Sequence, residues 1–387
     1  MIRLIAALVV CMSSLPGLTF AQEALAPVEA RVPFAPSPFV GSDGATHLAY
    51  ELHITNFYGD TGPLKPSTVL VFGDDATQPL LKLDQAAVSG LIRPAPAEGA
   101  SASIPPGKRG VIYLWITLPQ GAAIPKVLHH RVEFGTDKNG VAILDGVRVP
   151  VSENKVQTIG APLRGGRWLA HEGPGASGSH HWGSLVAVNG DLTIPQRYAL
   201  DLVGVDDSGR AIRKGVANIQ KTVYADWIGY GADVIAVADG TVVGARDGEE
   251  EHAPLTGQPE PASLTANGLF GNYVILKIGP DTFADYAHLQ RGSVKVKVGD
   301  RVSKGQVLAH LGQSGNSAAP HLHFQLANAA TFEGSEGIPY VFESYDFYGP
   351  EVEAQLFGTG DAWKSDKPQP RHGQLPLNDV VIRFPKN

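Results

Sequence analysis

The sequence predicts an all-β protein with two domains, an N-terminal β-sandwich followed by a domain built on an antiparallel β-sheet. Three observations predict this class. The chain has 387 residues, which is more than one ordinary hydrophobic core accommodates. Its 45 glycines and 29 prolines, with only 18% charged residues, favour many short strands over long helices. Apolar residues recur with period two between these turn residues, which is the spacing of half-buried strands.

Residues 1–21 have the features of a secretory signal peptide. Arg3 supplies the positive charge, residues 4–15 form a short apolar stretch, and TFA ending at Ala21 offers small residues for cleavage. The apolar stretch is shorter than the roughly 20 residues that a membrane-spanning helix needs. We therefore expect a periplasmic or secreted protein without stable membrane insertion. The single cysteine, Cys11, lies in this segment, so the mature chain would hold neither a disulfide nor a thiolate metal site.

Residues 22–157 are predicted to form the β-sandwich. The alternating runs are HLAYELHITN, STVLVFG, GVIYLWITLP and HHRVEFG, each bounded by turn residues. The segment offers no catalytic constellation, because the adjacent His129 and His130 would point to opposite faces of a strand. Its expected role is positioning or contact with a partner, such as another envelope protein.

Residues 158–350 are predicted to form the second domain. Its strand runs are separated by two long polar interruptions, 206–231 and 249–268, and loops of this length commonly serve a function. The run GDRVSKGQVLAHLG indicates a hairpin. The tail, 351–387, is Pro-rich and ends in DVVIRF, which we expect to be an edge strand. A net charge of −7 without any basic stripe argues against a nucleic-acid partner.

The most informative short segment is His321-Leu322-His323, directly after a proline. In a strand, alternate side chains leave on the same face, so both histidines would point together while Leu322 and Phe324 enter the core. Two imidazoles on one face suit a metal ligand and a proton-transfer partner.

Five phrases around this segment occur in a recognisable order: AVADGTVV, GNYVIL, YAHL, VGDRVSKGQVLAHLG and SGNSAAPHLHF. On these phrases, residues 196–326 resemble the M23 (lysostaphin/LytM-type) zinc metallopeptidases, which cleave peptide cross-links in peptidoglycan. The resemblance implies a LytM-type antiparallel β-sheet, Zn²⁺ as cofactor and peptidoglycan peptides as substrate. It also implies a zinc endopeptidase that acts on stem peptides or cross-links.

The resemblance assigns roles to four residues. His323 and Asp201 correspond to zinc ligands, and His288 and His321 correspond to the two catalytic imidazoles. The chemistry suits these residue types, because three protein ligands leave one zinc position for water, and zinc lowers the pKa of that water towards about 7. The two imidazoles can then orient or deprotonate the water and protonate the leaving amine.

The chain departs from the family's HxxxD element, because Arg197 stands four residues before Asp201. Arginine stays protonated and cannot bind zinc. In one interpretation the third ligand is His181 or His180 in ASGSHHWGS, with a slight preference for His181. In the other, the domain is a catalytically inactive LytM-like module that binds wall material or regulates an amidase. Arg197 itself would bind a substrate carboxylate or pair with Asp201.

Overall fold

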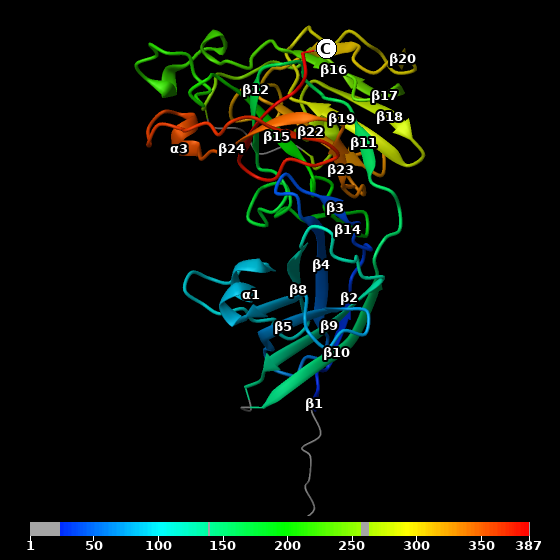
Figure 1. Cartoon of the computed structure of the whole chain (residues 1–387). Coiled ribbons are helices and arrows are strands. Elements are labelled where there is room, and N and C mark those ends of the chain that lie inside the picture. Colours follow the sequence, from blue (N-terminus) through cyan, green and yellow to red (C-terminus); the bar gives the residue numbers. More distant parts are fainter. Residues whose placement is uncertain (1–23, 138–139, 257–262, 387) are drawn as a thin grey trace, which may run out of the picture.

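The computed structural model describes residues 24–137, 140–256 and 263–386, and it shows two β-rich units placed end to end (Figure 1). The predicted signal peptide, with Cys11, lies outside the described residues. Within the described chain, no helix is long and apolar enough to cross a membrane. The predicted all-β class is confirmed, since the described helices are short: α1 (Gln85–Leu91), α2 (Ala266–Leu269), α3 (Glu353–Leu356) and the 3₁₀ turns Ile219–Lys221 and Tyr224–Asp226.

Two sheets face each other in the N-terminal unit. One has the order β1 (Ala24–Leu25), β10 (Val141–Pro150), β9 (Val127–Gly135), β5 (Lys65–Gly73) and β6 (Leu81–Asp84). The other has the order β2 (Val28–Arg31), β4 (Thr46–Asn56), β8 (Lys108–Leu118) and β7 (Ile92–Arg93), with β3 (Phe39–Val40) paired to β4. Leu52 and Ile112 of one sheet and Val69 and Val132 of the other share one hydrophobic core, as the sandwich prediction requires.

The second unit contains a ten-stranded sheet. Its order is β20 (Arg301–Val302), β17 (Gly240–Arg246), β18 (Tyr273–Gly279), β19 (Thr282–Ala287), β22 (Leu322–Ala327), β15 (Leu200–Val205), β12 (Arg167–His171), β26 (Val380–Arg383), β24 (Tyr345–Pro350) and β25 (Gln369–Arg371). Three strand pairs flank it: β11 (Gln157–Ile159) with β23 (Tyr340–Phe342), β13 (Val186–Val188) with β14 (Asp191–Thr193), and β16 (Asp233–Ile235) with β21 (Val307–His310).

Strand β4 is buried on both faces, which joins the two units. Its even-numbered residues, such as Leu52, enter the sandwich core, whereas Ala49 belongs to the core of the second unit. The neighbouring strand β8 does the same, because Tyr113 packs in the second core while Ile112 packs in the first. The two units therefore share a packed, partly apolar interface.

Two sequence predictions about strand partners are wrong. DVVIRF is not an edge strand, because β26 pairs with β12 on one side and β24 on the other. Nor does GDRVSKGQVLAHLG form a hairpin: β20 pairs with β17, and β21 pairs with β16 in a separate two-stranded sheet. In both cases the apolar period identified a strand correctly but carried no information about its partner.

Candidate active site and metal site

Four adjacent strands, β19, β22, β15 and β12, bring the candidate residues into one row. Asp201 on β15 lies opposite His323 on β22 and opposite His171 on β12. Ala287, the last residue of β19, lies opposite His323, so His288 follows beside it. The order of strands in the sheet thus brings Asp201 and His323, which are 122 positions apart, into contact.

The alternation expected for the HLH segment is present. Leu322 and Phe324 lie in the core, and His321 and His323 line the opposite, open side. A groove of about 1020 Å³ runs along that side, and both long polar interruptions contribute to its walls, through Ile219 and Leu255 among others. Within the described chain, none of the groove-lining residues precedes His171. No described residue of the N-terminal sandwich therefore lines the groove.

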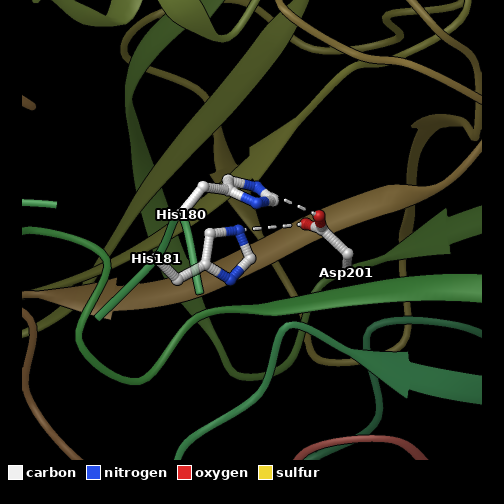
Figure 2. A group of neighbouring side chains, drawn as sticks. All are labelled: His180, His181 and Asp201. Carbon is white, nitrogen blue, oxygen red and sulfur yellow. Dashed lines mark ion pairs between the residues drawn. The ribbon is translucent and has the colours of Figure 1, made fainter. Parts of the chain in front are cut away.

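The loop after β12 brings His180 and His181 to Asp201 (Figure 2). His181 Nε2 lies 3.4 Å from Asp201 Oδ1, and His180 Nε2 lies 3.6 Å from Asp201 Oδ2. One ligand atom from each of these three residues lies within 4.8 Å of the others. The rings of His181 and His323 have their centroids 4.8 Å apart. Both histidines that the sequence offered as substitutes for position 197 thus reach the site.

Backbone carbonyls fix the tautomers of three histidines. The Nδ1 atom of His181 lies 2.9 Å from Glu172 O, that of His288 lies 2.8 Å from Ser314 O, and that of His321 lies 2.7 Å from Ala319 O. A carbonyl oxygen only accepts, so Nδ1 carries the proton in each ring. In the neutral form of each ring, Nε2 then carries the free lone pair.

The hydrogen bonds of His323 favour the opposite tautomer, with the proton on Nε2. Its Nε2 lies 2.9 Å from Gln325 Oε1, and the Gln325 amide donates to Asp285 Oδ2 at 3.0 Å. Its Nδ1 lies 3.0 Å from Asp201 Oδ1. The lone pair of His323 is thereby directed at Asp201, which is the arrangement that outer hydrogen bonds give to metal-bound histidines.

The charge states at neutral pH suit a cation. Burial lowers the pKa of His181 to about 4, and burial together with the nearby His321 holds the pKa of His288 well below its usual value. Burial raises the pKa of Asp201, but interactions with the surrounding His321, His181 and His180 outweigh it and hold this pKa well below its usual value. The site therefore offers neutral imidazoles beside a carboxylate.

His180 differs from His181 in exposure and charge. Its side chain is 61% exposed and lies between Asp201 and Glu172, whose Oε2 is 3.5 Å from His180 Nδ1. Partial burial lowers the pKa of His180, but its hydrogen bonds to Asp201 and Glu172 raise it above the ordinary value. The buried, neutral His181 is therefore the better metal donor of the two.

The residues present fit a zinc ion. Among the described residues, the Nε2 atoms of His181 and His321 are buried and make no hydrogen bond, although burying a polar atom unpaired is costly. Two imidazole nitrogens and one carboxylate match the donor set of catalytic zinc sites with an open fourth position. His181, Asp201 and His323 can supply these donors.

Arg197 does not take either of the roles expected for it. It is buried and forms ion pairs with Glu51 of the N-terminal unit and with Glu336, rather than with Asp201 or at the groove. The guanidinium is buried beside two interior carboxylates, because a buried cation requires partners of opposite charge.

Three residues that support the site were not predicted from the sequence. Gln325 was detectable in principle, since it lies two residues after His323 in the same strand and shares its face. Asp285 and Glu172 gave no signal, because their partners, Gln325 and His181, lie beside them only in the folded chain.

The sequence model of peptidase family M23 matches residues 226–333. Peptidoglycan DD-endopeptidase ShyC of Vibrio cholerae is 33% identical over 95 residues, which is 24% of this chain and 19% of that protein. Glycyl-glycine endopeptidase ALE-1 of Staphylococcus capitis is 55% identical over 82 residues, which is 21% of this chain and 22% of that protein. The chain thus spans about a fifth of the length of these relatives.

Among solved structures, the catalytic domain of lysostaphin from Staphylococcus simulans aligns with 44% of this chain and 86% of its own, at 21% identity. The TM-score is 0.24, which is too low to support conclusions about shape. His180, His181 and Asp201 precede the segment that the family model matches, whereas His288, His321 and His323 lie inside it. Residues 226–333 are thus the part of the chain that matches peptidase family M23.

Proposed function

We propose that the protein is a zinc endopeptidase that hydrolyses stem peptides or peptide cross-links of peptidoglycan. One observation carries the proposal: Asp201, His288, His321 and His323 line one groove, and the buried His181 Nε2 lies 3.4 Å from Asp201 Oδ1. Relatives named as peptidoglycan and glycyl-glycine endopeptidases support the choice of substrate class.

In this proposal His181, Asp201 and His323 hold the metal. When bound, zinc polarises the scissile carbonyl and acidifies a water molecule. His288 and His321, whose ring centroids are 4.8 Å apart, both line the groove. One imidazole takes the proton from the attacking water, and the protonated ring then donates to the leaving amine or to the oxyanion.

We also propose where the protein is located and how the chain divides into domains. The apolar segment 1–21 and the peptidoglycan substrate favour the periplasm or the exterior of the cell. We assign 22–157 to the sandwich, 158–350 to the peptidase domain and 351–387 to the tail, whose strand β26 extends the peptidase sheet. Contact with an envelope protein through the sandwich stays a prediction.

The experiment measures bound zinc in the mature protein and muropeptide release from purified sacculi. We expect about one zinc per chain, lost in His323→Ala and His181→Ala but retained in His180→Ala. His372→Ala, at an exposed histidine that does not line the groove, serves as the matched control and should behave like the wild type. A mature protein that binds no zinc at neutral pH would refute the proposal.

The second candidate is the catalytically inactive LytM-like module, and Arg197 at the expected ligand position is the observation that favours it. His288→Ala separates the two candidates, because His288 is outside the proposed ligand set. Turnover that is lost in this variant while zinc is retained supports the enzyme. Wild-type protein that binds zinc and sacculi but releases no muropeptide supports the module.

A further inference from the structure

We propose that the N-terminal sandwich is a positioning part of the metal site, and that Glu51 on β4 holds the loop that carries His181. The inference rests on the proposed function, since it requires His181 to be a ligand. It gives the sandwich a specific task, which is to fix a donor that the peptidase sheet does not itself hold.

Glu51 contacts both sequence features that distinguish this site. Its Oε1 accepts a hydrogen bond of 2.7 Å from Trp182 Nε1, and Trp182 is the residue next to His181. The same oxygen pairs with Arg197, which stands four residues before Asp201. Glu51 is 4% exposed and Trp182 is 1% exposed, so water does not compete for these bonds. The Glu51 carboxylate therefore links Arg197, which stands at the position expected for a zinc-binding histidine, to the loop of His181, the proposed substitute ligand.

Further contacts hold the same loop against the sandwich. The Trp182 ring packs on Tyr113 and Trp115 of β8, with ring centroids 5.6 Å away in each case. Tyr113 Oη donates to Gly183 O at 3.3 Å, and Arg93 Nη2 donates to Ser177 O at 3.1 Å. The loop from 177 to 183 is thus anchored from the N-terminal unit at both of its ends.

The loop needs such anchoring. Residues 172–185, all within the described chain, contain no strand, so no sheet ladder fixes them. On the peptidase side, His181 is held by Glu172 O, and Ser179 Oγ accepts from the backbone N–H groups of His181 and Trp182. A zinc–nitrogen bond requires about 2.0–2.1 Å, so a donor on an unpaired loop depends on its outer contacts.

Two variants test the link. In Glu51→Gln, the amide oxygen is a weaker acceptor for Trp182 than the carboxylate, and the charge that pairs with the Arg197 guanidinium is lost. In Trp182→Phe, ring packing is retained while the N–H donor is lost. Outer contacts of this kind are typically worth about 10- to 100-fold in metal affinity, and we expect at least about a tenfold loss in each variant. The measurement is zinc affinity of the full mature chain by competition with a chelator.

Two controls isolate the positioning effect from general destabilisation. Glu133→Gln changes an acidic residue on β9 of the other sheet and should leave zinc affinity unchanged. Glu336→Gln weakens the Arg197 network without touching Trp182, so it should lower resistance to urea but leave zinc affinity within about threefold of wild type.

The outcomes separate this inference from the proposed function. Weaker zinc binding in Glu51→Gln and Trp182→Phe, with Glu336→Gln unaffected, supports it. Folded variants that bind zinc within about twofold of the wild type overturn it and leave the proposed function intact. If Glu51→Gln does not fold, as judged by near-ultraviolet circular dichroism, Trp182→Phe alone decides. A wild-type protein without zinc affinity removes the proposed function and this inference with it.

Discussion

Replacing Arg197 by methionine tests whether the arginine stabilises the fold as a buried ion-pair partner. Arg197, Glu51 and Glu336 are each at most 5% exposed, so the change leaves two carboxylates buried without their cation. Removing one partner of a buried pair costs about 3–5 kcal/mol. Burial already raises the pKa of Glu336 to about 7, against the opposing effect of Arg197, so Glu336 would take up a proton in the variant. This uptake limits the loss of unfolding free energy to about 3–5 kcal/mol rather than twice that.

The assay is urea unfolding at pH 7.5, extrapolated to water, for wild-type and Arg197→Met protein. A triple variant, Arg197→Met with Glu51→Gln and Glu336→Gln, should recover much of the loss, because neutral groups replace the stranded charges. A loss below about 1 kcal/mol in Arg197→Met would show that the three residues do not form a buried network.

Three further predictions concern other parts of the molecule. Gln325→Leu removes the acceptor that fixes His323, so zinc affinity measured by chelator competition should fall about 10- to 100-fold, whereas Gln325→Glu should largely retain it. Burial raises the pKa of Glu351 to about 8, so the folded state retains a proton that the unfolded state releases above about pH 4.5. Unfolding free energy should therefore fall as pH rises from 4.5 to 8, and Glu351→Gln should flatten urea midpoints across this range; a variant with an unchanged slope contradicts the assignment. Tyr286→Phe leaves the Val237 N–H buried without its acceptor at 2.9 Å and should cost about 1–3 kcal/mol by urea unfolding; an unchanged midpoint would show that the N–H finds another partner.

Local patterns in the sequence predicted the parts of the site that depend on neighbours in the chain. The alternation of His321, Leu322, His323 and Phe324 placed the two histidines on one face, because a strand has period two. The same alternation predicted the strands of the sandwich. These inferences required no knowledge of what packs against each strand.

Contacts between residues that are far apart in the chain could not be predicted from the sequence. The contact between Glu51 and Arg197 spans 146 residues, and no local pattern marks either residue as the partner of the other. This contact explains why the expectation of an Arg197–Asp201 pair was wrong. The choice between His181 and His180 likewise depended on burial, since the two residues are adjacent in sequence and differ only in what surrounds them.

The position of β26 has a consequence for the order in which the protein is assembled. Strand β12 carries His171 and leads into the histidine loop, yet one of its two neighbours is β26, which is more than 200 residues further along the chain. A ribosome adds about 5–20 residues per second, so β12 waits on the order of ten seconds or more for this neighbour. During synthesis its unpaired edge is open to wrong pairing. The strand that leads into the histidine loop thus gains its second neighbour only when nearly the whole chain has been made.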